Sequence, residues 1–408
     1  MFKVPGGLFP RLIAFFPLLF PLYFFRGTLL GVPVSLPELV LGILFVLFLL
    51  QGYEFRLRDW KLWPVLLFLL AAGLSIAVVF VGDGSGELPR MVDGTEFPAK
   101  MKALGILKGW IVAPVLYFVM ARTIFREKPS MMFWALRALV LSGAVLSVLA
   151  LVQVVTGDFL TPDMRASGPF ESANYLALYL GPLVVFAGLA AVESDSKGDR
   201  IFLGICAVLG AAALFFSKSY AGWIAVAGAG SLGLLLLARR RSRKSFWIAF
   251  AALFGLGLVL LLSQLGTDKF AQFVDFAGRS SSSVRLQIYE ISTALIADHP
   301  LLGIGMGQFE QQYQEVAEVV LGSAPFEWNM LHPHNILLAF WLNMGLLGLG
   351  AFVWLCGRAL LWLTERDKKE RHLVALMLVT LLIHGLFDTP YFKNDLAFQF
   401  WLFMAMLL

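Results

Sequence analysis

The side chains best suited to move a proton at neutral pH gather in one part of the sequence. Three of the five histidines, His299, His332 and His334, lie between residues 299 and 334. Imidazole titrates close to neutrality, so a histidine can act as a general base that removes a proton from an attacking hydroxyl. His334 and Asn335 directly precede a long apolar run, a position that is equally typical of a packed histidine. The chemistry of His334 therefore depends on its neighbours.

Basic side chains that could bind a phosphate or a diphosphate accompany the histidines. Arg279 and Arg285 lie in the same stretch, and Arg165 and Lys218 lie in other polar turns. A guanidinium matches phosphate oxygens with two parallel hydrogen bonds, whereas lysine supplies a point charge. Each of these residues taken singly is explained by a solvated loop. Together with His334 they indicate a site that neutralises an anionic leaving group.

Carboxylates near these residues leave further roles open. Asp163 and Glu171 flank Arg165 and could serve as a base or contact an acceptor, although loop solvation or a helix start also explains them. Asp388 lies near the end of a late apolar run. We expect the Asp388 carboxylate to pair with a basic residue of the site.

Metal and nucleotide sites explain these residues less well. His332 and His334 could share a metal ion, but no cysteine accompanies them and Pro333 between them does not favour a common geometry. The glycines of Gly303–Gly307 follow no predicted strand, as a phosphate-binding loop would require. The two cysteines lie inside apolar runs, which favours neither a disulfide nor a zinc site. We therefore predict no metal and no cofactor.

The chain that carries these residues has the composition of a membrane protein. Of its 408 residues 59% are hydrophobic and only 14% are charged, and the mean hydropathy is +0.80. Soluble domains carry charge at about a quarter of their residues. The composition excludes a soluble enzyme, a disordered chain and a nucleic-acid-binding domain. The predicted fold class is an all-α polytopic membrane protein whose partner is the lipid bilayer, with no nucleic acid.

Apolar runs of about 20 residues predict about twelve transmembrane helices. The first run contains Pro17 and Pro21 and lacks a small-residue cleavage site, so we expect an uncleaved first span. The last run is short. We expect spans one to nine within residues 1–266, a large outer loop over 267–334, and spans ten to twelve within 335–408. The approximate centres are Leu19, Leu44, Leu70, Leu116, Leu146, Val184, Val208, Ala229, Leu256, Leu347, Leu378 and Phe403.

Basic residues predict the orientation of these spans. Short loops on one side carry most of the lysines and arginines, notably in Arg239–Lys244 and Arg366–Arg371. Such clusters set topology and contact lipid headgroups on the cytoplasmic side. This pattern predicts that both termini are cytoplasmic and that the 267–334 loop lies outside. The fewer outer basic residues are Arg26, Arg90, Lys100, Arg165, Lys218, Lys269, Arg279, Arg285 and Lys393.

The large outer loop has the pattern of a folded segment. Apolar residues recur at helical spacing after a serine-rich start, at Val284, Ile288, Ile291 and Leu295. The same spacing returns at Phe309, Tyr313, Val316 and Val320. We expect two amphipathic helices over the mouth of the membrane region. Gly303–Gly307 would form a flexible joint between them.

Several of these residues occur in an order that resembles the O-antigen ligase and polymerase superfamily. His334-Asn335, followed after nine residues by Gly345-Leu346-Leu347-Gly348, is similar to its His-Asn…Gly-x-x-Gly signature. The resemblance covers about residues 165 to 390. It includes Arg165-Ala166-Ser167-Gly168-Pro169-Phe170 with Asn174 and Ala177, Arg285-Leu286-Gln287-Ile288-Tyr289, the Asp298–Phe309 segment, and His384-Gly385-Leu386-Phe387-Asp388.

One turn departs from the family pattern. Residues Ser217–Trp223 resemble a Ser-Arg-Gly-type turn in which the family commonly has a second functional arginine. Tyr220 stands at the aligned position here, and Lys218 precedes it by two residues. Lys218 could supply the positive charge, but without the fork of a guanidinium. The departure leaves the geometry of phosphate binding open.

The resemblance implies transfer of a glycan from an undecaprenyl-diphosphate carrier to an acceptor. The reaction would take place on the periplasmic face of the bacterial inner membrane. His334 would act as the general base, and Arg285 would stabilise the charge that develops on the diphosphate. For Asn335 we favour a cap of the tenth span over a role in orienting the imidazole. The other predicted substrate-binding residues are Arg279, Lys218, Arg165, His332 and Asn335.

The acceptor separates three members of this reaction class. A ligase uses lipid A–core, a polymerase uses a second carrier-linked repeat, and an oligosaccharyltransferase uses a protein hydroxyl. The moderate loop and the lack of a large soluble C-terminal extension favour the ligase. A transporter of an anionic lipid-linked substrate is an alternative of another class, but it predicts paired halves with interrupted helices at the membrane centre. The sequence does not show that pattern.

Overall fold

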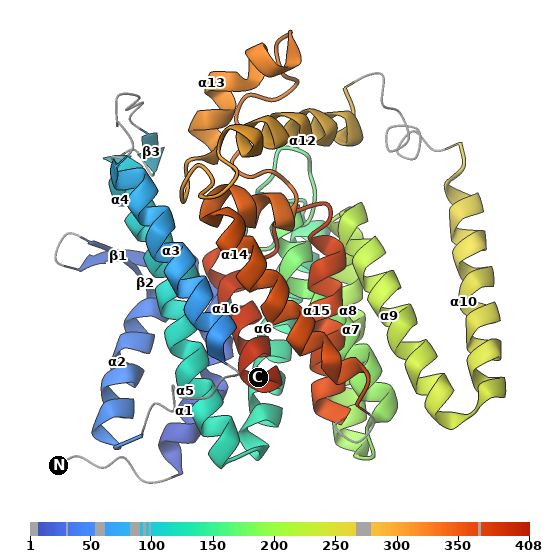
Figure 1. Ribbon diagram of the computed structural model, residues 1–408. Helices are drawn as coiled ribbons and strands as arrows, with labels where there is room; N and C mark the ends of the chain where they lie inside the picture. The colour runs from blue at the N-terminus through green and yellow to red at the C-terminus, as the bar shows by residue number, and fades with distance from the viewer. Residues whose placement is uncertain are drawn as a thin grey trace.

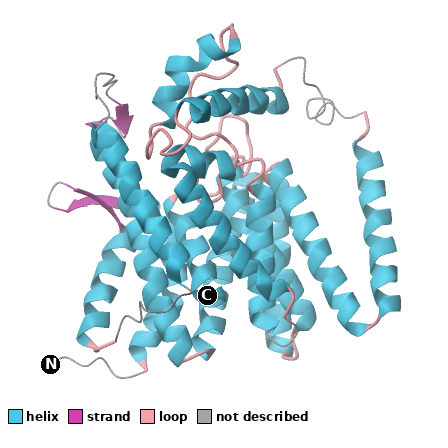
Figure 2. Ribbon diagram, in the orientation of Figure 1, coloured by secondary structure: helices cyan, strands magenta, loops and turns pink. Residues whose placement is uncertain are grey.

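Helices account for most of the computed structural model (Figure 2). It describes residues 7–29, 32–53, 62–81, 90–92, 95–97, 99–266, 279–365 and 369–408. Every one of the twelve expected span centres falls in a helix. Among the described residues, seven helical segments are long and apolar enough to cross a membrane. The chain is therefore a polytopic all-α membrane protein, as predicted, while the count of twelve spans stays a prediction.

The N-terminal part contains short helices and two β-hairpins that the apolar runs did not predict. The elements are α1 (Leu8–Phe15), the 3₁₀ helix η1 (Phe16–Phe24), β1 (Arg26–Leu29), β2 (Val32–Ser35), α2 (Leu36–Leu50), α3 (Trp63–Val81), β3 (Arg90–Val92), β4 (Thr95–Phe97), α4 (Ala99–Ile106), the π-helix η3 (Leu107–Val112) and α5 (Ala113–Glu127). Pro17 and Pro21 cannot donate to the helix ladder, and the first span continues there as the tighter η1. Ser35 and Glu38 form a capping box, so the first hairpin passes directly into α2.

The remaining elements complete the bundle and the outer layer. They are α6 (Ser130–Thr156), α7 (Ala173–Glu193), α8 (Lys197–Phe216), α9 (Tyr220–Arg241), α10 (Arg243–Gln264), α12 (Ser281–Asp298), α13 (Phe309–Leu321), α14 (Ile336–Leu360), η4 (Leu361–Leu363), α15 (Lys369–His384) and α16 (Asn394–Leu407). Helix α10 stands at the edge of the bundle beside α9 (Figure 1). None of the described α10 side chains is buried. Helix α10 is therefore a peripheral helix of the bundle.

The short last helix lies at the centre of the bundle. Every residue from Asp395 to Leu407 is buried, and α16 packs against α5, η1 and α15. A helix that is apolar on all sides is stable when other helices surround it. Trp401 makes edge contacts with Phe68 of α3 and Phe118 of α5, with ring centroids 5.3 and 5.1 Å apart. The last apolar run thus forms an interior helix.

Two helices cover the bundle at one end, as the apolar spacing of the outer loop predicted. α12 lies across the end of α14, and α13 lies above it (Figure 1). Ile288, Ile291, Phe309 and Tyr313 form a separate core with Leu342 of α14. Residues 267–278, at the start of the predicted loop, lie outside the described part of the chain. The structure thus has helices at both stretches with helical apolar spacing, while their place in an outer loop stays a prediction.

The glycine segment between these helices is packed, and the prediction of a flexible joint is wrong. Gly303, Gly305 and Gly307 all have positive φ angles, of 68°, 91° and 76°. Ile304 donates its N–H to the carbonyl of Leu342 at 2.9 Å, and the N–H of Gly307 donates to the side chain of Asn343 at 2.9 Å. These bonds attach the segment to α14. Gly303 must be glycine because a Cβ there would collide with the backbone of Trp341 and Leu342.

A break in α14 receives this segment. Gly345 has φ 67° and ψ −174°, which interrupts the helix. A Cβ at Gly345 would collide with the carbonyl oxygen of Leu301, and Leu346 donates its N–H to that same oxygen at 3.0 Å. The first glycine of the Gly-x-x-Gly motif thus admits the outer loop into the helix. The start of α14, where His334 lies, is fixed to α12 and α13.

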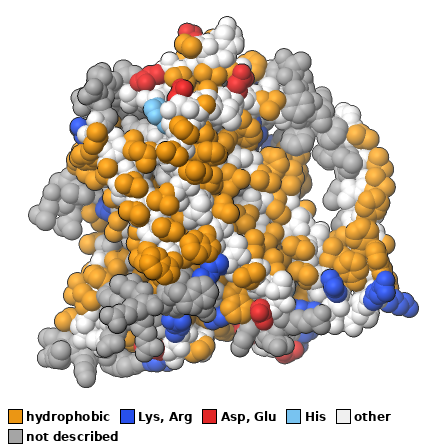
Figure 3. All heavy atoms as spheres, viewed as in Figure 1, with side chains coloured by type: hydrophobic (Ala, Val, Ile, Leu, Met, Phe, Trp, Pro, Cys, Tyr) orange, Lys and Arg blue, Asp and Glu red, His pale blue; other side chains and the backbone are white. Residues whose placement is uncertain are grey.

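Charged and apolar side chains occupy different parts of the surface. Apolar side chains cover the flank, and Lys and Arg gather at the end opposite to α12 and α13 (Figure 3). Lipid-facing helices and basic cytoplasmic loops produce such a distribution. The surface supports the orientation predicted from the sequence, which remains a prediction.

Candidate active site

His334 and Asp388 form the central contact of the site. His334 Nδ1 lies 3.3 Å from Asp388 Oδ1, although 54 positions separate the two residues. The His334 side chain is 30% exposed and that of Asp388 is 5% exposed. The imidazole thus reaches the surface while the carboxylate behind it is enclosed. The expectation that Asp388 pairs with a basic residue is confirmed.

Its surroundings favour the ionised form of Asp388. Burial opposes ionisation, but the charge and hydrogen bond of His334 outweigh it. The ring of His384 and the N–H of Thr389, which donates to Asp388 Oδ1 at 2.8 Å, act in the same direction. The pKa of the Asp388 carboxyl therefore lies well below its usual range. An ionised carboxylate accepts a hydrogen bond from Nδ1–H, which leaves Nε2 as the basic nitrogen of the imidazole.

The backbone at His334 is held in an uncommon conformation. His334 has φ 47°, a region that non-glycine residues rarely occupy. The Tyr289 hydroxyl lies 3.0 Å from the His334 carbonyl and 3.1 Å from that of Leu386, to either of which it can donate. Burial raises the pKa of this phenol, so it remains protonated. Tyr289 thus fixes the two segments that carry His334 and Asp388.

Asn335 caps α14, as we favoured from the sequence. Its side-chain oxygen accepts the N–H groups of Leu337 at 2.9 Å and Leu338 at 3.2 Å. Its amide nitrogen lies 3.4 Å from the carbonyl of Leu386, and the N–H of Ile336 donates to Gly385 at 2.7 Å. Asn335 therefore determines where the helix begins, directly after His334.

Arg285 lies beside this pair on α12. Its Nε donates to the Phe387 carbonyl at 3.2 Å and its Nη1 to the Ser281 carbonyl at 3.0 Å. Arg285 and Tyr289 are four residues apart, so the same face of α12 meets the 386–387 turn. Nη2 of Arg285 has no hydrogen-bond partner among the described residues. The structure thus brings Arg285, His334 and Asp388 together.

His332 lies under the site as a neutral ring. Its centroid is 6.0 Å from that of Trp110. Burial lowers the pKa of His332 to about 4, with the charges of His334 and Lys102 acting in the same direction and Asp388 opposing them. At neutral pH His332 therefore offers an uncharged imidazole beside His334.

Arg165 and Lys218 form a second basic group. Arg165 Nε donates to the Ser217 carbonyl at 2.6 Å, Nη2 to Asn174 at 2.8 Å and Nη1 to Asp163 at 3.2 Å. Nε thus joins the 157–172 loop to the turn that contains Lys218, Nη2 joins it to α7, and Nη1 bonds within the loop. Lys218 has φ 51° in that turn. Arg165 fixes the position of the lysine.

Helix α9, which begins two residues after Lys218, packs against the segment that carries Asp388. Its Gly222 is so close to His384 that a Cβ there would lie 3.5 Å from the imidazole. His384 precedes Asp388 by one helical turn, and its carbonyl accepts the Asp388 N–H at 3.1 Å. The start of α9, two residues after Lys218, is therefore packed against the Asp388 turn.

Arg279 occupies a different position. Its guanidinium is paired with Glu327, and its side chain is 66% exposed. Glu327 belongs to the segment after α13. The Tyr313 hydroxyl donates to the Glu327 carbonyl at 2.9 Å. The described contacts join Arg279 to this outer segment, not to His334.

Lys393 is a buried cation that the sequence did not assign to the site. Its Nζ lies 4.0, 4.1 and 4.7 Å from the ring centroids of Phe170, Tyr175 and Tyr23, and 3.9 Å from Asp395. Burial lowers the pKa of Lys393 to about 8, although Asp395 opposes this. Three segments meet around this cation, five residues after Asp388. Only its outer position was recognisable from the sequence.

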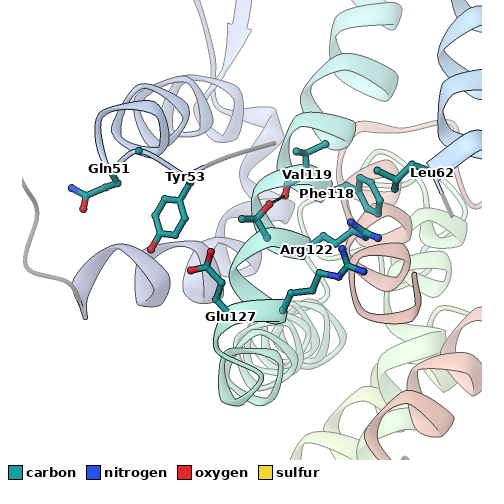
Figure 4. Close-up of a pocket in the computed structure, with 10 residues that line it drawn as sticks. Gln51, Tyr53, Leu62, Phe118, Val119, Arg122 and Glu127 are labelled. Atoms are coloured by element: carbon teal, nitrogen blue, oxygen red, sulfur yellow. Dashed lines mark hydrogen bonds between the residues drawn. The ribbon is translucent and has the colours of Figure 1, made fainter. Parts of the chain in front are cut away.

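A separate cavity of about 500 Å³ lies at the end of α5. Figure 4 shows Gln51 and Tyr53 on one side of it and Phe118 and Arg122 on the other. None of the predicted site residues lines this cavity. It is distinct from the His334 site.

Comparison with known families agrees with the order of the motifs. Residues 205–353 match the family model described as O-antigen ligase. No curated protein matches the chain. The matched range contains Arg285 and His334, while Arg165 and Asp388 lie on either side of it. This match, over residues 205–353, and the motifs around it support the resemblance to the O-antigen ligase and polymerase superfamily.

Proposed function

We propose that this protein is an O-antigen ligase-like glycosyltransferase that transfers a glycan from undecaprenyl diphosphate to lipid A–core. The observation that carries the proposal is the contact of His334 with Asp388 beside Arg285. A hydroxyl of the acceptor attacks the anomeric carbon of the donor glycan. The bond from that carbon to the diphosphate oxygen breaks, and undecaprenyl diphosphate leaves with the bonding electrons.

His334 and Asp388 serve the attacking hydroxyl. Nε2 of the neutral imidazole accepts the hydroxyl proton, and Asp388 stabilises the imidazolium that results. Because 30% of the His334 side chain is exposed, an acceptor can approach the ring from outside. General-base catalysis of this kind contributes about 10²–10⁴-fold to a rate.

Arg285 serves the leaving group. Its Nε and Nη1 are held by carbonyl oxygens, which orient the guanidinium and leave Nη2 for the diphosphate. Lys218, positioned by Arg165, adds a second positive charge, and His332 and Asn335 bind or shape the substrate pocket. Arg279 is the weakest member of the predicted set because Glu327 holds it. A diphosphate that leaves between fixed positive charges requires no metal ion in this scheme.

The same residues would serve two related reactions. A polymerase with a second carrier-linked repeat as acceptor, and a protein O-oligosaccharyltransferase, are equally compatible with the family match. A transporter of a lipid-linked substrate is less favoured, since the predicted site residues lie near one end of the bundle and not at its centre. We place the reaction on the periplasmic face of the bacterial inner membrane, with both termini cytoplasmic, because the basic residues gather at the opposite end.

The test is glycan transfer by the purified protein in lipid nanodiscs. Undecaprenyl-diphosphate oligosaccharide is supplied with lipid A–core, with a second carrier-linked oligosaccharide, or with a serine-containing protein. We expect lipid A–core to gain the glycan. His334→Ala should lower transfer about 10²–10⁴-fold, while His299→Ala, an exposed histidine at the end of α12, should not.

Each other outcome of this test has a definite meaning. Transfer to the second oligosaccharide or to the protein would replace the ligase with the corresponding relative. Full transfer by the His334→Ala protein would exclude His334 as the base. Translocation of the donor without transfer to any acceptor would favour the transporter.

A further inference from the structure

A groove of about 780 Å³ lies where α7, α9 and α10 meet. Helix α9 begins near His384 and extends over 22 residues to Arg241, which lines the groove. At 1.5 Å per residue, the groove lies about 30 Å from the His334 end. It is therefore separate from the proposed transfer site.

One end of the groove carries an excess of positive charge. Arg200, Arg240, Arg241 and Lys369 line it, against only Glu193 and Asp195. Arg240 Nη1 lies 4.0 Å from Glu193, Arg200 donates to the Ser194 carbonyl at 2.7 Å, and Lys369 donates to the Glu193 carbonyl. Arg241 is exposed, with no hydrogen bond or ion pair to the described residues. The two carboxylates leave a net positive end.

The N-terminus of α10 adds to this preference for an anion. Ser242 caps the helix by accepting the Ser245 N–H at 3.0 Å, and Ser245 lines the groove. The helix dipole favours negative charge at such a terminus. The basic side chains and the helix end thus face the same space.

The rest of the groove is apolar. Leu234 and Leu237 of α9 face Ile248, Ala252 and Leu253 of α10. Ile248 is 60% exposed, because α10 packs on α9 and on little else. Within a bilayer such walls are solvated by hydrocarbon chains rather than by water. The occupant must therefore combine an anionic end with an apolar body.

We propose that this groove binds one anionic phospholipid of the membrane. Its phosphate lies between Arg240, Arg241 and the start of α10, and its acyl chains lie between α9 and α10. A free phosphate would use the arginines but not the apolar walls. A helix from a second copy of the chain would use the walls but would leave the positive charge unmatched. The lipid matches both parts and holds α10 to the bundle.

The test is lipid binding to the purified full chain by native mass spectrometry. The chain is titrated with phosphatidylglycerol and with phosphatidylcholine of the same acyl chains. We expect phosphatidylglycerol to bind at least tenfold more tightly. The double variant Arg240→Gln/Arg241→Gln should weaken it roughly 30-fold, which is the combined contribution of two basic residues beside an anionic lipid.

Matched variants separate the site from general surface charge. Arg126→Gln/Lys128→Gln removes the same charge at the end of α5, outside the groove lining, and it should retain binding. Leu253→Trp keeps every arginine but fills the apolar part, and it should lose binding. Circular dichroism and a monodisperse elution profile show that each variant is folded.

Four results would overturn the proposal. These are equal binding of both lipids, equal loss in the two double variants, full binding by Leu253→Trp, and displacement of the lipid by millimolar inorganic phosphate. A groove occupied by a second copy would appear as a dimer that phosphatidylglycerol dissociates, which would also reject a lipid as the native occupant. Binding requires no glycan transfer, so its outcome is independent of the proposed function.

Discussion

Replacing Asp388 with asparagine tests whether this carboxylate acts through His334. The change keeps the shape of the side chain but removes the charge that faces Nδ1. Two unit charges 3.3 Å apart interact by about 5 kcal/mol at an effective dielectric constant of about 20. Because the His334 side chain is 30% exposed, solvent screens part of this. We therefore expect a loss of about 2–4 kcal/mol in transition-state stabilisation, or about 30- to 10³-fold in rate.

The assay is the initial rate of glycan transfer with the acceptor that proves active. Asp388→Asn should lower kcat with little change in KM for the donor, because Asp388 touches the base rather than the diphosphate. Asp298→Asn is the matched control, since it is an exposed carboxylate at the end of α12. It should transfer glycan at the rate of the unmodified protein.

The double variant Asp388→Asn/His334→Ala decides the mechanism. If Asp388 acts only through the imidazole, the double variant should be no slower than His334→Ala alone. An additional 30-fold loss in the double variant would refute the reasoning, because Asp388 would then act without the imidazole. An Asp388→Asn protein with unchanged kcat would refute it as well.

Three further predictions concern the elements that position the site, each measured by thermal unfolding in detergent. Gly345→Ala should lower the free energy of unfolding by more than about 2 kcal/mol, because its φ of 67° disfavours a side chain and a Cβ would collide with the Leu301 carbonyl. The control Gly350→Ala has open space around it and should be neutral or stabilising. Asn335→Ala should cost about 1 kcal/mol through loss of the α14 cap, and Asn335→Asp should retain most of that stability, so equal losses would exclude the cap. Lys393→Met should lower the free energy of unfolding by about 3–5 kcal/mol because it leaves Asp395 buried without its cation. The double variant Lys393→Met/Asp395→Leu should recover part of that loss. No recovery would show that the contacts with the aromatic rings, not the ion pair, stabilise this region.

The site was partly predictable because its motifs are local. His334 and Asn335 stand directly before an apolar run, and Arg285 and Tyr289 recur at helical spacing. These relations depend on neighbours within a few positions, so the chain order records them. The separation of Arg279 from His334 could not be predicted in this way, because its partner Glu327 lies 48 positions away. Closeness in the sequence placed Arg279 in the site, whereas the fold places it beside the segment after α13.

The glycine segment shows the same limit. Three glycines within five positions suggested mobility, since glycine has the greatest backbone freedom. In the fold that freedom is used to enter the break at Gly345, where any side chain would collide with the backbone. Which of the two roles a glycine serves depends on what packs against it.

The sequence by itself determined that this chain crosses a membrane in many helices, because apolar runs and helical spacing are local properties. It also singled out His334 and Arg285, the residues to which the proposed reaction assigns the base and the diphosphate contact. Only the tertiary structure decided that Asp388 contacts His334, that Lys393 lies among rings from three segments, and that the last apolar helix lies at the centre. Those features depend on which distant residues share an enclosed space, and packing, not the order of the chain, determines that.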